Sequence, residues 1–330
     1  MDYILIFSTI INFCFSYLLT LIFVPLIRKF ALARGIFDIP NERKLHTKPI
    51  PRLGGCSLAL SFLLVSILSN YLFPDKNLLN SEKEIYLIIS ALGFFTLGLV
   101  DDLKKLSPIL RLVFQFLLAT LFTVKVLSFS QLKFVFPILD QNISFDVNII
   151  FYVISAIWIV GVTNAINWID GLDGLLVGNT LLVTLALSYV SLINDNYSAL
   201  QYSVFVLGFC LAFFKFNSPK ASIYLGDGGS YFIGFLLSVL PIISVNNNSF
   251  FYDQSILNIN FIFTFFILFV PIIDMPVVIL SRLIRGKSPF YPDRNHFHHR
   301  LIDAGFSVEK TLFVICLITF CTSVFAMIFE

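Results

Sequence analysis

Charge is scarce in this sequence. Asp, Glu, Lys and Arg make up only 13% of the 330 residues, whereas they make up roughly 25% of a typical soluble domain. Hydrophobic residues account for 58%, Phe alone occurs 39 times, and the mean hydropathy is +0.89. So few charged residues cannot cover the surface of a soluble protein. For this class of protein we expect no nucleic-acid partner. The composition indicates a protein that crosses a lipid bilayer many times.

Cysteine is also sparse and shows no paired spacing. The five cysteines lie in or beside apolar runs, at Cys14, Cys56, Cys210, Cys316 and Cys321. This pattern argues against a disulfide framework and against a thiolate metal site. We interpret them as small packing residues.

Ten apolar runs are long enough, or nearly so, to cross about 30 Å of hydrocarbon as helices. They cover residues 4–27, 53–73, 84–100, 109–128, 149–166, 174–193, 199–216, 228–246, 259–281 and 309–329. We therefore expect an all-α, polytopic integral membrane protein with about ten transmembrane helices.

The segments that connect the apolar runs lie alternately on the two sides of the membrane, and the two sides differ in positive charge. Only four of the 22 Lys and Arg residues, namely Lys76, Lys83, Lys125 and Lys133, fall on one side. Because positive charge marks the cytoplasmic side, we expect the basic segments in the cytoplasm and both termini outside. One external segment, 129–148, alternates with the period of a strand and predicts a small hairpin.

Five polar clusters interrupt the apolar sequence, and all five lie on the basic side. Ionisable residues at membrane depth are energetically costly, so each cluster is a hypothesis of function. The clusters are 44–55, 101–102, 164–174, 224–230 and 296–300. Their convergence predicts one catalytic domain, 1–330, whose active site is built from five cytoplasmic loops.

Asp101 and Asp102 end the third apolar run. Acids at the C-terminal end of a helix oppose its dipole, which weakens the alternative of an acidic cap followed by solvated lysines. Adjacent helical residues point about 100° apart, so we expect different roles. One carboxylate would face a metal or phosphate, and the other would act as a base or hold a cation. Arg111, at the start of the next run, could reach back to the same site.

The segment 164–174 places amides and a carboxylate along one helical stripe. Asn164, Asn167 and Asp170 recur every third residue, and Asp173 follows in the turn. Two glycines nearby let the backbone bend and approach a ligand closely. The alternative interpretation is a capped helix–turn–helix.

Asp227, in the sequence YLGDGGS at the start of the eighth run, is placed to be a simple helix N-cap. The same geometry would expose backbone N–H groups to an anionic ligand. Beside two other acidic clusters, a divalent cation bound by Asp227, other oxygens and substrate phosphates is favoured. Ligation by few carboxylates is typical of Mg²⁺.

The last cluster is rich in histidine. His296 and His299 would share a helical face, whereas His298 would not. A zinc site stays open, but no cysteine or fourth ligand is near. The adjacent Arg294 and Arg300 favour a phosphate-binding or proton-handling loop, with a solvated basic loop as the alternative.

The first basic loop and the ninth run complete the candidate set. The loop contains Lys44, His46, Lys48 and Arg52 and ends in a glycine pair. A membrane anchor alone could explain the positive charges, but it would not explain the histidine, the prolines and the glycine pair. In the ninth run, two prolines flank Asp274 and predict a kinked or broken helix. This acid is either a connection to the active site or a satisfied structural charge.

Together and in this order, from KLHTKPIPRLGG to NHFHHRL, the five motifs resemble the bacterial polyprenyl-phosphate N-acetylhexosamine-1-phosphate transferases of glycosyltransferase family 4. The resemblance covers essentially the whole chain. The PRLGG and HFHHR forms are more similar to the branch that starts O-antigen, enterobacterial antigen or teichoic-acid linkage synthesis. The branch that uses UDP-MurNAc-pentapeptide is the nearer alternative.

The resemblance implies transfer of a HexNAc-1-phosphate, with GlcNAc-1-phosphate expected first, from a UDP-sugar to undecaprenyl phosphate. UMP is released, and the reaction needs Mg²⁺, with Mn²⁺ as a substitute. It would take place at the cytoplasmic face of the bacterial inner membrane, as the first membrane step of envelope polysaccharide synthesis. Beyond the lipid bilayer and these substrates, a homodimer is left open.

The resemblance also assigns roles. Asp227 and Asn167 would hold Mg²⁺, Asp173 would contact the uracil, and Tyr224 would stack on it. Asp101 or Asp102 would deprotonate or orient the lipid phosphate. Arg111 stands where the family has a lysine near the phosphates, which keeps the charge but alters the contact geometry. The other substrate-binding candidates are Lys44, His46, Lys48, Arg52, Asn164, Asp170, His296, His298, His299 and Arg300.

An ion-coupled transporter is the rival of a different class. It would use intramembrane acids and would place polar residues at the bilayer midplane and on both sides. Here they gather on one side, with Asp274 the main exception.

Overall fold

A computed structural model describes residues 3–40, 48–73, 81–127, 131–136, 141–146, 149–246, 256–291 and 293–329. Two candidate site residues, Lys44 and His46, lie outside the described residues.

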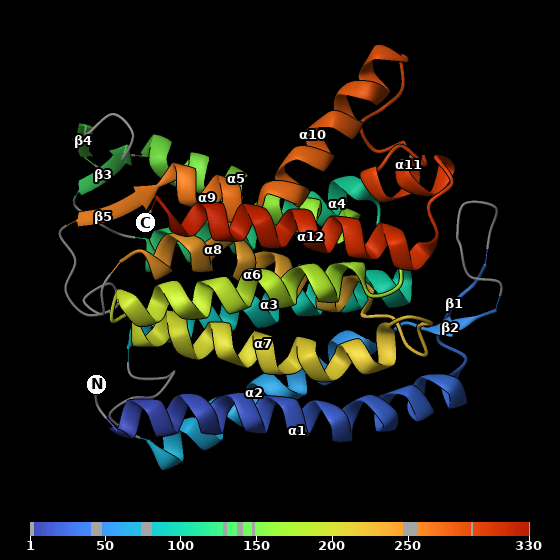
Figure 1. The fold of residues 1–330 in the computed structure, drawn as a ribbon, viewed down its shortest axis with the longest axis horizontal. Helices are drawn as coiled ribbons and strands as arrows, with labels where there is room; N and C mark the ends of the chain where they lie inside the picture. The colour runs from blue at the N-terminus through green and yellow to red at the C-terminus, as the bar shows by residue number, and fades with distance from the viewer. Residues whose placement is uncertain are drawn as a thin grey trace.

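Long apolar helices lying roughly side by side make up most of the described chain (Figure 1). Nine of them are long and apolar enough to cross a membrane. They are α1 (Tyr3–Arg34), α2 (Gly54–Leu72), α3 (Glu82–Lys104), α4 (Pro108–Val126), α5 (Ile149–Trp168), α6 (Leu175–Ile193), α7 (Tyr197–Asn217), α8 (Gly226–Ser244) and α12 (Val308–Met327). The all-α membrane architecture expected from hydropathy is confirmed.

The tenth expected span is a broken helix, as its prolines predict. Helices α9 (Phe261–Ile267) and α10 (Phe269–Ile284) meet at Leu268 and are bent by 79° relative to each other. Pro276 lies inside α10, where it removes one backbone hydrogen bond. Because of the bend at Leu268, α10 leans away from the bundle (Figure 1), and the short α11 (Phe297–Asp303) follows it.

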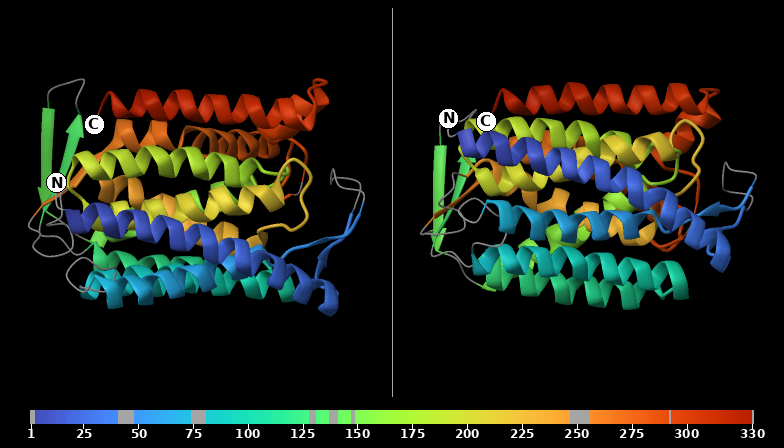
Figure 2. Two further views of the ribbon diagram at one scale, coloured as in Figure 1. Left: turned by 60° about the horizontal axis from the view of Figure 1, so that its bottom comes forward. Right: turned by 90° about the horizontal axis from the view of Figure 1, so that it is seen from below.

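Both termini lie at one end of the bundle, and the basic connections with α11 lie at the other (Figures 1 and 2). The end with the termini also carries the predicted hairpin, which is confirmed. Strand β3 (Gln131–Phe136) pairs antiparallel with β4 (Gln141–Asp146), with Gln131 opposite Asp146. A third strand that the sequence did not predict, β5 (Ile256–Asn260), pairs parallel with β3. At the opposite end, β1 (Phe37–Asp38) pairs with β2 (Ile50–Pro51).

Helix α8 is the centre of the bundle and is almost completely buried. Its aromatic side chains pack between neighbouring helices. The ring centroid of Phe232 lies 5.1 Å from that of Phe62 in α2, and Phe235 stacks on Phe94 of α3 with 5.0 Å between the ring centroids. The outer helices bury one face and expose apolar side chains on the other, as expected of helices in contact with lipid.

Glycines bring the first turn of α8 into backbone contact with α2 and α3. A Cβ atom at Gly55 would lie 2.3 Å from the Gly229 nitrogen, and one at Gly98 would lie 2.2 Å from the Asp227 carbonyl oxygen. Only residues without a side chain permit this approach. The end of α3 and the starts of α2 and α8 therefore meet at one point, where three of the five polar clusters lie.

Candidate active site

Asp227 is the second residue of α8, and its carboxylate is held from two sides. Asn167 Nδ2, at the end of α5, donates to Oδ1 at 2.8 Å, and Arg52 Nη2 donates to Oδ2 at 3.1 Å. Asn167 also donates to Ser230 Oγ at 2.8 Å, one turn further along α8. The Asp227 side chain remains 23% exposed, so part of the carboxylate faces open space. The structure thus brings together the two residues expected to bind metal.

Asp102 satisfies the backbone of α8 from the neighbouring helix. Its carboxylate accepts the N–H groups of Asp227 and Gly228, each at 3.0 Å, and pairs with Arg52 at 2.5 Å. Its side chain is only 1% exposed. The residue before α8, Leu225, provides no capping side chain. Asp102 caps the helix from α3 instead, and its negative charge complements the helix dipole. The glycine before Asp227, Gly226, has a φ of +77°, and a Cβ there would meet Asp102 Oδ2 at 2.6 Å.

Arg52 lies among three carboxylates at this junction. Besides Asp102 and Asp227, Asp38 of β1 lies 3.6 Å from its Nη1. Burial alone would lower the pKa of the guanidinium, but the three carboxylates raise it above its ordinary value. The positive charge of Arg52 is therefore a permanent part of the site.

Asp101 faces away from Asp102, as the helical angle predicts. It accepts the Leu106 N–H at 2.7 Å and pairs with Arg111 Nη1 at 2.8 Å. Arg111 also donates to Tyr231 Oη at 3.3 Å. The two acids have different partners, and Arg111 does reach back from α4. Each carboxylate receives hydrogen bonds on both oxygens, so the roles of Asp101 and Asp102 as base or lipid-phosphate ligand stay predictions.

Asp170 lies in the turn between α5 and α6. No N–H or O–H group among the described residues donates to its half-buried carboxylate. Burial first, and then the neighbouring charge of Asp227, raise its pKa to about 7, opposed by Arg52. Near neutral pH this carboxyl is therefore partly protonated, and a bound cation would favour its ionised form.

Asp173 joins the same turn to the segment before α8. It accepts the Ala221 N–H at 2.9 Å and the Tyr224 hydroxyl at 3.2 Å. Burial and Asp173 raise the pKa of Tyr224 above its ordinary value, so the phenol stays protonated. Tyr224 is also bonded through its backbone to Pro51 and Gly54, which connects the first basic loop to this side of the site.

The histidine cluster is attached to the broken span through Asp274. His296 Nδ1 lies 2.7 Å from Asp274 Oδ2, and the Phe297 N–H donates to Oδ1 at 2.7 Å. His296 also makes an edge contact with Trp168, at 5.6 Å between ring centroids. Asp274 is therefore a hydrogen-bonded charge that contacts the histidine cluster, and its connection to an active site stays a prediction.

His298 packs against the Asp170 turn. A Cβ at Gly171 would lie 2.5 Å from His298 Nε2, so only glycine lets the ring approach. Burial, followed by the neighbouring histidines, lowers the pKa of His298 to about 3; burial and Arg294 lower that of His299 to about 4. Both rings are neutral at physiological pH. Lys48 and Arg300 are exposed.

Arg282, in the last turn of α10, is a site neighbour that sequence reasoning missed. Its side chain is 4% exposed, lies 4.9 Å over the Trp168 ring, and donates to Asp293 Oδ1 at 2.9 Å and to the Pro289 carbonyl at 2.6 Å. Burial would raise the pKa of Asp293, but the bond from Arg282 lowers it to about 2. In sequence Arg282 is one of many basic residues, so its only signal was its position six residues after Pro276.

Comparisons with known proteins show which enzymes this sequence is similar to. Residues 85–245 match the sequence profile of glycosyl transferase family 4. The chain is therefore similar to this family, over just under half of its length. It is 29% identical to a probable undecaprenyl-phosphate N-acetylglucosaminyl 1-phosphate transferase of Bacillus subtilis, over 97% of this chain and 85% of the relative.

Two further relatives represent the two donor branches. An undecaprenyl-phosphate alpha-N-acetylglucosaminyl 1-phosphate transferase of Salmonella typhimurium is 28% identical, over 91% of this chain and 78% of the relative. A phospho-N-acetylmuramoyl-pentapeptide-transferase of Bacillus pumilus is 25% identical, over 92% of this chain and 91% of the relative.

The oxygen atoms at this site suit a hard cation with few protein ligands. Within the described ranges, no three His, Cys, Asp or Glu side chains are arranged to enclose a metal ion. Asp227 and the Asn167 amide offer oxygen atoms beside Arg52, with the rest of the coordination left to ligand oxygens. Mg²⁺ binds in this way, through one or two carboxylates, water and phosphates.

Replacing Asp102 tests its structural role. In Asp102→Asn, the amide nitrogen would face a backbone N–H of α8 or Arg52, and one buried donor would lose its acceptor. We expect the free energy of unfolding to fall by about 1–3 kcal/mol, measured as a lower thermal unfolding midpoint in detergent. Asp303→Asn, which breaks an exposed ion pair with Arg294, should change it by less than about 1 kcal/mol. Equal midpoints for the two variants would contradict the capping role.

Proposed function

We propose that this protein transfers N-acetylglucosamine 1-phosphate from UDP-GlcNAc to a polyprenyl phosphate and releases UMP. The observation that carries this conclusion is the convergence, at one end of a membrane bundle, of Asp227 and Asn167 with the cations Arg52 and Arg111. The names of the relatives supply the sugar and the lipid. The transporter alternative is disfavoured, because the charged site residues gather at one end of the bundle.

The chemistry needs this arrangement. Two anionic substrates must meet in line, and little covalent work falls to the protein, so catalysis depends on positioning and on charge stabilisation. Arg52 pairs with the Asp227 carboxylate, and Arg111, paired with Asp101, adds a second fixed positive charge that acts on it. Asp102 and Asp101 hold these arginines in place and so contribute to orientation whichever of them contacts the lipid phosphate.

Mg²⁺, or Mn²⁺ in its place, fits beside Asp227 and Asn167. When bound, the ion would neutralise charge on the diphosphate and orient it for displacement. Asp170, whose carboxylate receives no hydrogen bond from the described residues, would face the same charge. The neutral His298 and His299, with Arg300, would cover the diphosphate or the sugar from the side of the Asp170 turn.

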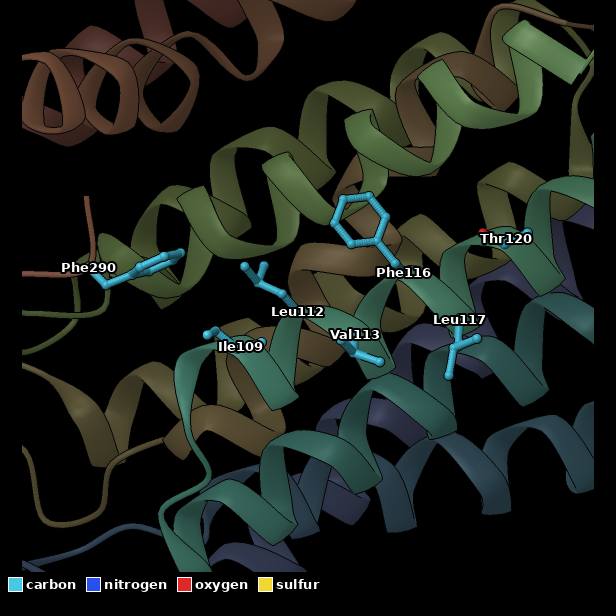
Figure 3. A pocket seen from close by; sticks show the side chains of 7 residues that line it. All are labelled: Ile109, Leu112, Val113, Phe116, Leu117, Thr120 and Phe290. Atoms are coloured by element: carbon cyan, nitrogen blue, oxygen red, sulfur yellow. The ribbon is translucent and has the colours of Figure 1, made fainter. Parts of the chain in front are cut away.

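The acceptor lipid has a route to the site from the membrane. An apolar groove of about 470 Å³ lies along α4, with Phe290 from the segment after α10 as its opposite wall (Figure 3). Beside it, α5 exposes Ile154 and Ile157, and this stripe continues through Gly161 to Trp168 at the site. We assign the polyprenyl chain to this groove and stripe.

The cellular setting follows from the charge distribution. Because Lys and Arg concentrate at the site end, we place the active site at the cytoplasmic face of the bacterial inner membrane. Undecaprenyl phosphate is then the acceptor, and the reaction begins the synthesis of an envelope polysaccharide.

A UMP-release assay tests the function. Purified protein receives undecaprenyl phosphate and Mg²⁺ with UDP-GlcNAc, UDP-GalNAc, a UDP-6-deoxy-HexNAc or UDP-MurNAc-pentapeptide. We expect turnover with UDP-GlcNAc that depends on both the lipid and the metal. Turnover only with UDP-MurNAc-pentapeptide would assign the other branch, and folded protein inactive with all four donors would refute the proposal.

Asp227→Ala tests the metal assignment. Without the carboxylate, Mg²⁺-dependent turnover should fall by about 100-fold or more, while the thermal unfolding midpoint without Mg²⁺ stays close to that of the wild type. The added stabilisation that Mg²⁺ and UDP-GlcNAc give the wild-type protein should also be lost. Ordinary activity of Asp227→Ala at the same Mg²⁺ concentration would remove Asp227 as a ligand.

Gly161→Leu tests the lipid route. A Cβ at Gly161 would meet no atom within 4 Å, and leucine favours a helix over glycine by about 1 kcal/mol, so the variant should fold. A leucine there would obstruct a long chain, lowering kcat/KM with undecaprenyl phosphate by about tenfold. A phosphate with one isoprene unit should be unaffected. Cys14→Leu, at an exposed position of α1, is the control, and an equal loss with both acceptors would count against the route.

A further inference from the structure

Gln115 is a fully buried amide in α4, one helical turn beyond Arg111. Its Oε1 accepts a hydrogen bond from Asn164 Nδ2 of α5 at 2.7 Å. Its own Nε2 has no partner among the described residues. A buried donor without an acceptor is destabilising, so packing alone would favour an apolar side chain of the same size. The polar contact that favours glutamine here is therefore the one made by its Oε1, which accepts the hydrogen bond from Asn164.

The hydrogen bonds of Asn164 determine which of its atoms is available to a ligand. Its Nδ2 also donates to the Val160 carbonyl at 2.8 Å. An amide nitrogen carries two hydrogens, so both donors of Asn164 are used. Its Oδ1 receives no hydrogen bond from the part of the chain that the structure describes, and the side chain is only half-buried. Asn164 thus offers a carbonyl oxygen, one helical turn from Asn167, which binds Asp227.

A carbonyl oxygen selects the kind of group that it can bind. It cannot hydrogen-bond a deprotonated phosphate oxygen, because both atoms are acceptors. It can accept from a hydroxyl or an amide N–H. The uracil N–H is expected near Asp173 and Tyr224, on the side of the site formed by β2 and the segment before α8, whereas Asn164 faces α4. The donors that remain in a UDP-HexNAc are the hydroxyls and the acetamido N–H of the sugar.

We propose that Gln115 is a positioning residue that fixes the Asn164 amide so that its Oδ1 accepts a hydrogen bond from the transferred sugar. This role rests on the proposed function. Without the Gln115 oxygen, the Asn164 nitrogen keeps only one of its two acceptors, the Val160 carbonyl. The amide is then less firmly fixed, and its oxygen faces the donor groups of the sugar for a smaller part of the time. The sugar end of the donor substrate then lies beside α4 and α5, and its uridine end lies beside Tyr224.

Two nearly isosteric variants of the full-length protein separate this role from packing. Gln115→Met keeps the volume but removes the oxygen, and Gln115→Glu keeps an acceptor oxygen. In the UMP-release assay, Gln115→Met should raise KM for UDP-GlcNAc about tenfold and leave KM for undecaprenyl phosphate unchanged. The KM of Gln115→Glu for UDP-GlcNAc should be close to that of the wild type.

The Asn164→Ala background shows whether Gln115 acts through Asn164. If it does, adding Gln115→Met to Asn164→Ala should not raise KM for UDP-GlcNAc further. A further tenfold rise in the double variant, or a rise in KM for the lipid in place of UDP-GlcNAc, would overturn the proposal. Thermal unfolding midpoints of all variants show whether a loss of fold accounts for a change. Wild-type protein that releases no UMP would instead refute the proposed function, and this role with it.

Discussion

The first turn of α8 lies inside the protein, where water cannot satisfy its backbone N–H groups, and the rest of the site depends on how this turn is satisfied. Asp102 supplies the acceptors from α3. Its buried charge is in turn balanced by Arg52, which also bonds Asp227. The contact that lets α8 begin in the core therefore also orients the residue proposed to bind the metal. Stability and function share the same hydrogen bonds here.

A second connection joins the membrane-facing part of the molecule to the site. The broken span holds Asp274 near its bend, and this carboxylate orients His296 and the start of α11. Arg282 at the end of the same helix packs on Trp168, next to Asn167, and bonds the segment that carries Phe290. Phe290 at the apolar groove and the histidine cluster are thus attached to one helix, so α10 connects the groove proposed for the lipid with the histidines proposed to cover the sugar nucleotide.

Several features could be predicted from local pattern alone. The ten spans, the break shortly before Pro271, the divergent directions of Asp101 and Asp102 and the reach of Arg111 all depend on residues close in sequence. Other features could not. The capping role of Asp102 depends on α8, which lies far along the chain, and Gln115 reads as an isolated polar residue in an apolar helix until Asn164 is seen beside it. Strand β5 escaped prediction for the same reason, because its partner β3 is distant in sequence.

The sequence by itself determined that this protein is a helical membrane protein with its chemistry gathered at one end. Hydropathy and charge asymmetry are sums over neighbouring residues, and the bilayer acts on them before any tertiary contact forms. Only the tertiary structure decided which atoms meet: that Asp102 binds backbone, that Asp170 receives no hydrogen bond from the described residues, and that Asn164 offers an oxygen. These outcomes depend on hydrogen-bond geometry between helices that the chain connects only through long intervening segments.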